Sequence, residues 1–333
     1  MNIFFIGMGY MGVERLKNVI SLKKKYNLNI CGFYDPKIKI IKFKGVNLKS
    51  EKNFSKNILD KKKIDLCFIS VPHNLSLGYS LLCCKSKFSP HLVIEKPFGL
   101  NLAQAKRIIK AKKRKQQIYV GLNYRFFNGI NKMLQDIKNK KFGKINSLLI
   151  NFGHGHNPSI KSNWKLNKKF AGGGVILDPG IHIFNLINLF CSKLKVNYVK
   201  KLKNFWKTGV EEEASVLLSS KQVPLINITL SITRWRSTFE INGNGNKGYW
   251  RLSGRGRSYG AQKYLVGERW GWMKAKNQKL SEKLISSSNE KKVFLYESEA
   301  IIRKILNLKV HLNPCNDKEA FKTMQLIKKI YEK

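Results

Sequence analysis

The feature that most constrains this chain is a glycine-rich loop directly after a short apolar segment. Residues 2–6 have the sequence NIFFI and are predicted to form a strand, GMGYMG follows at residues 7–12, and a helix is expected to about residue 25. In a GxGxxG loop in this setting, the first glycine permits a tight turn and the second lets the backbone approach a pyrophosphate. The third glycine allows the helix to pack close to the strand. The loop predicts a dinucleotide-binding βαβ unit, with the phosphates at the helix N-terminus.

A second apolar strand is predicted over residues 28–34 and ends at Asp35. An acidic residue at about this distance hydrogen-bonds the adenosine ribose hydroxyls of a dinucleotide. A carboxylate would repel the additional phosphate of NADP, so NAD is the predicted cofactor, while Lys37 and Lys39 keep NADP open. The alternative for Asp35 is a turn residue before Pro36.

A third strand is predicted over residues 65–70, and Val71-Pro72-His73 forms the turn into the next helix. Turns at this edge of a parallel sheet normally line the cofactor. His73 is expected either to contact the nicotinamide ribose or to cap the helix.

Residues 91–97, with the sequence HLVIEKP, end an apolar run at a charged pair followed by proline. Consecutive apolar residues suit a parallel strand that is covered on both faces, and Pro97 keeps Lys96 out of the helical region. Lys96 is therefore expected at the carboxyl end of the strand, between cofactor and substrate hydroxyl; the alternative is a solvated lysine in a turn. The predicted cofactor-binding residues are Gly7, Gly9, Tyr10, Met11, Gly12, Asp35, Ser70, Pro72, His73, Glu95 and Lys96.

The alternation of strands and helices continues to a strand at residues 117–122. It predicts an NAD(P)-binding Rossmann domain with a doubly wound parallel sheet over residues 1–122. Residues 123–333 are predicted to form an α/β domain with a mostly antiparallel open sheet, for substrate binding and oligomerisation. Its strands are expected at residues 144–153, 214–218, 225–236, 238–242 and 249–253, with a polar loop at residues 277–292 and a docked terminal helix after the capping sequence at residues 316–319.

The composition favours an enzyme of the reducing cytoplasm. The net charge of +44 suggests nucleic acid as a partner, but 53 of the 64 basic residues are lysines spread along the chain, as in proteins of A/T-rich genomes. We therefore expect no specific nucleic-acid partner. The six cysteines lack CxxC spacing, which favours free thiols over disulfides or a metal site. Neither a signal peptide nor an apolar run of about 18 residues is apparent, so no membrane association is expected.

A second group of polar residues interrupts the apolar segment GGGVILDPGIHIFN at residues 172–185. Asp178 and His182 are four residues apart and are expected on one helical face, with Asn185 one turn further. Burying these groups without partners is costly, and an imidazole can accept a hydroxyl proton near neutral pH while a carboxylate orients it. The alternative is a satisfied pair in the core. The three glycines allow close approach of a ligand or another domain.

The glycine loop, Glu95-Lys96-Pro97, Tyr124-Arg125 and the segment with Asp178 and His182 together resemble the Gfo/Idh/MocA family of oxidoreductases. The resemblance covers essentially the whole chain. It implies a Rossmann domain, an α/β domain whose open sheet often mediates dimer or tetramer formation, a nicotinamide cofactor, and a polyol, sugar or sugar-derivative substrate.

The resemblance also implies roles for individual residues. Lys96 would contact the reacting hydroxyl and the cofactor, His182 would accept the proton, and Asp178 would bind substrate, which makes these three the predicted catalytic residues. The family pattern is broken at Asn185 and at Ser76, where aspartate and histidine are common. The predicted substrate-binding residues are Lys96, Tyr124, Arg125, His156, Trp164, Asp178 and His182.

The predicted function is hydride transfer between NAD(P) and a secondary hydroxyl or keto group of a sugar or sugar derivative. The segment GRSYG at residues 256–260 resembles family members of surface-polysaccharide metabolism, and Arg251, Arg255 and Arg257 could hold a diphosphate or carboxylate or lie in a solvated turn. The alternatives are a cyclitol dehydrogenase, and a non-catalytic cofactor-binding or basic nucleic-acid-binding protein.

Overall fold

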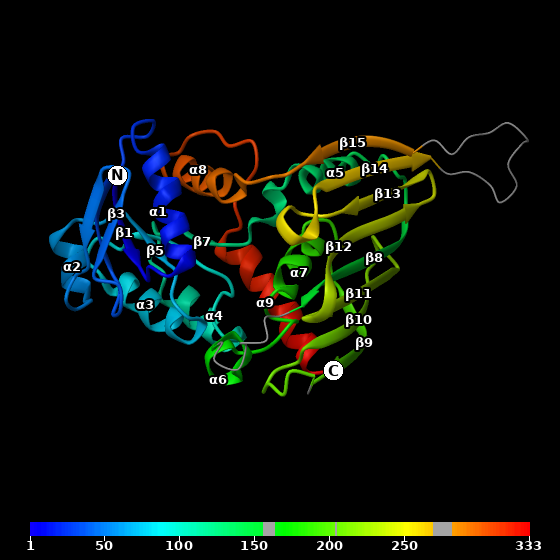
Figure 1. Cartoon of the computed structure of the whole chain (residues 1–333), viewed down its shortest axis with the longest axis horizontal. Coiled ribbons are helices and arrows are strands. Elements are labelled where there is room, and N and C mark those ends of the chain that lie inside the picture. The colour runs from blue at the N-terminus through cyan, green and yellow to red at the C-terminus, as the bar shows by residue number, and fades with distance from the viewer. Residues whose placement is uncertain (156–163, 204, 269–281) are drawn as a thin grey trace, which may run out of the picture. The chain divides into compact units, whose positions relative to one another are not determined.

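The computed structural model describes residues 1–155, 164–203, 205–268 and 282–333, which form two compact units (Figure 1). Unit 1 comprises Met1–Asn123, Lys169–Gly172 and Lys292–Gln325. Unit 2 comprises Tyr124–Lys168, Gly173–Lys291 and Leu326–Lys333. Residues 292–325, which we assigned from the sequence to the second domain, therefore fall in the first unit. The roles of the two domains remain predictions.

Unit 1 contains the expected parallel sheet, in the order β2-β1-β5-β6-β7. All neighbouring pairs are parallel. Every residue of β5 and the last three residues of β6 are buried, as strands covered on both faces require. The prediction of a doubly wound parallel sheet is confirmed. The strands are β1 (Asn2–Ile6), β2 (Asn29–Tyr34), β5 (Leu66–Ile69), β6 (His91–Ile94) and β7 (Ile118–Val120).

Helices cover both faces of this sheet. In the strand order, β2 lies on one side of β1, whereas β5, β6 and β7 follow on the other side. Because parallel crossovers are right-handed, this change of direction places α1 on one face of the sheet and α3 and α4 on the opposite face. Figure 1 shows α8 beside α1, and α3 between α2 and α4. The helices are α1 (Tyr10–Leu22), α2 (Lys56–Lys61), α3 (His73–Lys85), α4 (Leu102–Ala111) and α8 (Val293–Ile305).

A small hairpin of β3 (Ile40–Phe43) and β4 (Val46–Lys49) lies between β2 and α2, where the sequence analysis placed no strand. Lys44 and Gly45 in its turn have φ angles of 45° and 76°. Tight two-residue turns of hairpins require positive φ at both positions, which glycine adopts readily.

A buried ion-pair triad explains why the later segment belongs to unit 1. Arg15 on α1 is fully buried, and its Nε lies 2.7 Å from Glu95 Oε1. Its Nη2 lies 2.7 Å from Oε2 of Glu297 on α8, and its Nη1 donates to the Ser298 hydroxyl. Glu95, at the end of β6, is thus connected through one guanidinium to both helices. Ile301 and Ile302 of α8 complete the contact by packing in the apolar core of the unit.

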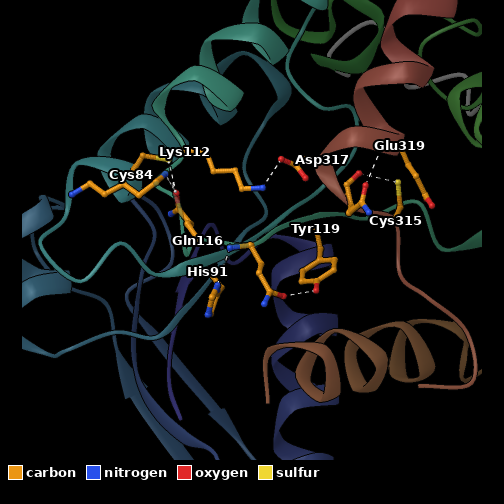
Figure 2. A network of polar contacts seen from close by, with 11 residues as sticks. Cys84, His91, Lys112, Gln116, Tyr119, Cys315, Asp317 and Glu319 are labelled. Carbon is orange, nitrogen blue, oxygen red and sulfur yellow. Dashed lines mark hydrogen bonds and ion pairs between the residues drawn. The ribbon is translucent and has the colours of Figure 1, made fainter. Parts of the chain in front are cut away.

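The segment before the last helix covers the edge of the sheet at β7, as Figure 2 shows. The Val120 N–H donates to the Cys315 carbonyl at 2.9 Å, and Lys112 forms an ion pair of 2.7 Å with Asp317. The hydrogen bond from Val120 satisfies a backbone N–H group that an edge strand otherwise exposes. Next to these contacts, Gln116 accepts from Cys84 Sγ and donates to the Pro90 carbonyl.

The predicted terminal helix is α9 (Asp317–Tyr331). The Asn316 side chain accepts from the Glu319 N–H at 3.0 Å, as the capping sequence predicted. The predicted apolar stripe of Ala320, Met324, Ile327 and Ile330 is buried. None of the helices within the described ranges is long and apolar enough to span a membrane.

Unit 2 contains an eight-stranded sheet in the order β15-β14-β13-β12-β8-β11-β10-β9. Only β8 and β11 pair in parallel, so the prediction of a mostly antiparallel open sheet is confirmed. One face is covered, with α5 (Asn128–Lys138) against β13 to β15. The strands are β8 (Ile145–Gly155), β9 (Lys195–Leu202), β10 (Glu213–Ser219), β11 (Leu225–Ser231), β12 (Thr233–Gly245), β13 (Gly248–Ser253), β14 (Gln262–Glu268) and β15 (Glu282–Ser288).

Several strands of this sheet differ from the sequence prediction. The expected single strand at residues 225–236 breaks at Ile232, because β11 and β12 pair with opposite sides of β8. The polar stretch at residues 277–292, predicted as a loop, contains the edge strand β15. The other edge strand, β9, and the interior strand β14 were also not predicted. Edge strands in contact with water need no apolar alternation, because backbone pairing with one neighbour holds them.

The other face of the sheet exposes several large apolar side chains. Tyr198, Leu225, Leu149 and Leu284 come from four different strands, and each is about half exposed. Oligomer formation through this face remains a prediction.

We predict that Arg15→Ala lowers the free energy of unfolding by about 3–5 kcal/mol, because it leaves the buried carboxylate of Glu297 and the partly buried one of Glu95 without their common partner. Urea titration followed by circular dichroism measures the change. The control is Lys25→Ala, which removes the more exposed ion pair between the turn that follows α1 and Glu299 on α8. Equal losses in the two variants would contradict the role of the buried triad.

Candidate functional site

The geometry of the glycine loop in unit 1 fits a dinucleotide phosphate. Gly7 has φ +84°, and a Cβ on it would lie 2.6 Å from the Ser70 carbonyl oxygen. A Cβ on Gly12 would collide with the Gly7 backbone, whereas none of the described atoms lies within 4 Å of a Cβ placed on Gly9. Gly7 and Gly12 are therefore closely packed, whereas the space next to Gly9, between them in sequence, is open. Because Val13 N–H donates to the Gly9 carbonyl, the amides of residues 10–12 lie at the positive end of α1.

Asp35, at the end of β2, holds this loop. Its Oδ2 accepts from the Met8 N–H at 2.7 Å, and its Oδ1 accepts from the N–H groups of Lys37 and Ile38 at 2.8 and 2.9 Å. Burial raises the pKa of Asp35, but these three hydrogen bonds and Lys39 together lower it below the ordinary value. Both carboxylate oxygens thus organise backbone. The contacts with Lys37 and Ile38 agree with the alternative prediction of a turn residue, whereas the contact with the glycine loop at Met8 was not predicted. Contact of Asp35 with a ribose remains a prediction.

The other predicted cofactor residues lie at the same edge of the parallel sheet. Ser70 and Lys96 follow the neighbouring strands β5 and β6, and Pro72 precedes α3. His73, the first residue of α3, is buried, and its Nδ1 donates to the Ala171 carbonyl at 3.1 Å. The Glu95 carboxylate faces Arg15, so the structure gives it a partner within the protein in addition to its predicted contact with the nicotinamide.

In unit 2, an aromatic stack contains His182. Tyr124 lies in the short 3-10 helix η1 (Asn123–Phe126), and His182 lies in α7 (Gly180–Asn188). Their rings are 3.9 Å apart and nearly parallel, at 8°. Burial raises the pKa of Tyr124 far above its ordinary value, and this effect exceeds the opposing one of Arg255. Tyr124 is therefore a neutral phenol that fixes the plane of the imidazole.

The prediction that Asp178 and His182 share a helical face is wrong. Asp178 precedes the helix, which begins at Gly180. Pro179 disfavours a helical conformation at the residue before it, so Asp178 lies in the turn that leads into α7. Its N–H donates to the Gly174 carbonyl at 2.7 Å. Its carboxylate lies 3.2 Å from Lys165 Nζ, a partner that sequence spacing did not indicate.

Two of the three glycines before Asp178, Gly173 and Gly174, permit close contacts within unit 2. A Cβ on Gly174 would collide with the Glu211 backbone, and one on Gly173 would collide with the Tyr331 hydroxyl. Glu211 Oε1 accepts from the N–H groups of Gly174 and Ile176 and, at 2.6 Å, from the Tyr331 hydroxyl. The absence of side chains at these glycines thus lets the turn pack against the buried carboxylate of Glu211.

The remaining predicted residues take different positions. Arg125 is buried, and its Nη2 donates to Asn185 Oδ1 at 3.0 Å. The asparagine that replaces the common aspartate of the family thus has a defined partner. Trp164 begins the short helix η3 (Trp164–Leu166), with Lys165 Nζ 6.0 Å from its ring centroid. His156 lies outside the described residues. Lys96 belongs to unit 1, whereas Asp178 and His182 belong to unit 2.

The arginines of residues 251–257 have separate environments. Arg251 is exposed and forms an ion pair with Glu282. Arg257 is exposed in the helix η4 (Arg257–Tyr259). The Arg255 guanidinium turns inward over Tyr124, next to the His182 stack. Among the residues that the structure describes, no group of three or more His, Cys, Asp or Glu side chains is placed to hold a metal ion.

We predict that Asp35→Asn flattens the acid limb of the stability profile. Because the pKa of folded Asp35 is lowered, its ionised form stabilises the protein above the unfolded-state value of about 4 and this contribution is lost as the pH falls below it. The melting temperature of the wild type should therefore fall more between pH 5 and pH 3 than that of the variant. Glu332→Gln, at an exposed site, serves as the control. Parallel profiles for wild type and Asp35→Asn would refute the assignment.

Tyr331→Phe is expected to lower the free energy of unfolding by about 1.5–3 kcal/mol, because a part-buried hydrogen bond to the Glu211 carboxylate is lost. The matched control is Tyr198→Phe on the exposed face of the sheet, where a change within about 0.5 kcal/mol is expected. Chemical denaturation measures both values. Indistinguishable values would show that Glu211 does not depend on this hydroxyl.

Comparison with known families agrees with both units. Residues 1–124 match the model of the oxidoreductase family with an NAD-binding Rossmann fold, and residues 130–251 match the GFO/IDH/MocA C-terminal domain. A curated relative, myo-inositol 2-dehydrogenase of Thermotoga maritima, is 26% identical over 189 residues, which cover 56% of this chain and 53% of the relative. The chain therefore spans about half the length of the curated relatives it matches.

Solved structures show the same fold at low sequence identity. Aldose-aldose oxidoreductase from Caulobacter crescentus, complexed with glycerol, has a TM-score of 0.74 at 16% identity, covering 100% of this chain and 96% of that chain. The WlbA dehydrogenase from Bordetella pertussis, in complex with NADH and UDP-GlcNAcA, has a TM-score of 0.76 at 13% identity, covering 100% and 95%. Together with the two family matches and the geometry of the glycine loop, these findings show that the chain belongs to the Gfo/Idh/MocA oxidoreductase family and begins with its NAD-binding Rossmann domain.

Proposed function

We propose that this chain transfers a hydride between NAD(P) and a secondary hydroxyl or keto group of a sugar or sugar derivative. The main observation is that this family member combines a well-formed dinucleotide loop with the imidazole of His182, which is stacked on the buried phenol of Tyr124. The carboxylate of Asp178 lies close to His182 in the sequence. These are groups that proton transfer during alcohol oxidation requires.

The bound dinucleotide supplies the hydride acceptor or donor. For oxidation, His182 accepts the hydroxyl proton, and its stacking on Tyr124 limits rotation of the ring. The ammonium group of Lys96 stabilises the developing alkoxide. Asp178, paired with Lys165, binds a neighbouring hydroxyl of the substrate. Reduction uses the same groups in reverse. The proposal requires Lys96 and His182 to act on one hydroxyl.

A sugar derivative is the favoured substrate. A structural relative is named as acting on aldoses, and another was solved with a nucleotide-linked sugar acid. The inward Arg255 and the GRSYG segment support a role in surface-polysaccharide metabolism. The second candidate is a cyclitol, which the Thermotoga maritima relative favours by its name.

Three further features belong to the same proposal. NAD is the favoured cofactor because Asp35 places negative charge at the end of β2, next to the loop. None of the six cysteines, all in the described ranges, forms a disulfide there, which supports a reducing compartment such as the cytoplasm. The exposed Leu149, Leu225 and Tyr198 on the open face of the sheet support a homo-oligomer.

The first test is titration with NAD and NADP, followed on the same sample by absorbance of the reduced nicotinamide across a panel of sugars, nucleotide sugars and cyclitols. We predict tighter binding of NAD and turnover of a sugar derivative. Absence of dinucleotide binding would refute the proposal, and turnover of cyclitols alone would establish the second candidate.

With a substrate in hand, Lys96→Ala and His182→Ala should each lower kcat about 10²- to 10⁴-fold, because each removes a positioned charge or proton acceptor. The matched controls are Lys110→Ala and His311→Ala, both at exposed positions. Steady-state rates measure the effect. Turnover close to wild type in either active-site variant would remove that residue from the mechanism.

A further inference from the structure

Arg255 lies in an aromatic cage within unit 2. Its guanidinium carbon is 4.2 Å from the ring centroid of Tyr259, 5.4 Å from that of Tyr124 and 5.5 Å from that of Phe152. A guanidinium packs well on aromatic faces, which hold its plane while leaving its N–H groups at the edge for an acceptor. The cage therefore fixes the orientation of the cation.

The loop that carries Arg255 is shaped to turn this side chain inward. Gly254 and Gly256 have φ angles of +74° and +83°, and a Cβ on Gly254 would collide with the Ala261 carbonyl. The Gly254 N–H donates to the Phe239 carbonyl at 2.8 Å, and the Gly256 N–H donates to the Gly260 carbonyl at 2.7 Å. Glycine on both sides and hydrogen bonds at both ends determine where the arginine points.

The charges around the cage leave Arg255 without an acidic partner. No carboxylate in the described part of the chain forms an ion pair with Arg255, and its buried Nε has no hydrogen-bond partner there. Asp178 contributes to raising the pKa of Arg255, but its carboxylate is already paired with Lys165. A half-buried cation of this kind is stabilised when an anion supplies the missing partner.

The cage shares Tyr124 with the His182 stack. Tyr124 lies against the imidazole at 3.9 Å and against Arg255 at 5.4 Å, so both polar groups contact the same ring. Tyr124 therefore connects the guanidinium to the proposed proton acceptor through a single ring. This arrangement differs from a solvated surface arginine such as Arg251.

We infer that Arg255 binds an anionic group, a carboxylate or phosphate, of the sugar derivative on which His182 acts. The inference rests on the proposed function and deepens it by naming the charge of the substrate. A planar guanidinium donates two parallel hydrogen bonds to either anion, which a neutral sugar hydroxyl cannot accept in the same way. Arg255 is then the residue that distinguishes an acidic or phosphorylated sugar from a neutral one.

The test is calorimetric titration of the full chain with D-glucose, D-glucuronate, D-glucose 6-phosphate and UDP-glucose, without dinucleotide. We expect at least one anionic ligand to bind the wild type about 10- to 100-fold more tightly than D-glucose, the range for a charge-assisted hydrogen bond. Arg255→Gln should abolish this preference and Arg251→Gln should retain it. The anionic ligand that binds identifies a carboxylate, a monophosphate or a diphosphate as the recognised group.

Arg255→Lys controls for the fold, because lysine keeps the positive charge but lacks the planar guanidinium that donates two parallel hydrogen bonds. It should melt near the wild-type temperature and show a weaker preference for the anion. An unchanged preference in both Arg255 variants, or no anionic ligand bound by the wild type, would overturn the inference. If the preference depends on Arg255 but no dinucleotide binds, the proposed function fails and the anion site stands.

Discussion

The buried guanidinium of Arg15 is the interaction on which the rest of unit 1 depends. It joins the helix after the glycine loop to Glu95 at the end of β6 and to Glu297 on α8. A charge with no exposed surface requires partners, and here the partners come from two distant parts of the chain. The ion pair with Glu95, which helps to neutralise Arg15, also holds the residue that precedes Lys96. Stability of the fold and placement of the candidate catalytic lysine therefore share one contact.

Other buried carboxylates have similar tasks. Asp35 accepts hydrogen bonds from the glycine loop, and Glu211 accepts them from the turn that precedes Asp178. Each places negative charge against backbone N–H groups of a segment that has no regular structure of its own. Such charge-assisted hydrogen bonds are stronger than neutral ones and leave a loop with few alternative conformations. The candidate groups for binding and proton transfer are thus held by acids that themselves face the backbone.

Local patterns predicted much of this fold. The apolar strands of the parallel sheet, the glycine loop and the capped helix α9 follow from residues close together in the sequence. The edge strands β9 and β15 did not, because their polar residues form strands through pairing with one neighbour. Asp178 was expected in a helix from its spacing to His182, and the effect of Pro179 outweighed that periodicity.

The sequence by itself determined the fold class, the dinucleotide loop and the identity of the candidate residues Lys96, Asp178 and His182. Tertiary structure alone decided the partners: Glu297 for Arg15, Lys165 for Asp178, and Tyr124 for both His182 and Arg255. The physical reason is that strand and helix formation depend on neighbouring residues, whereas the pairing of buried charges and rings depends on distant segments. A buried charge shows that a partner is needed, and only the folded chain shows which side chain supplies it.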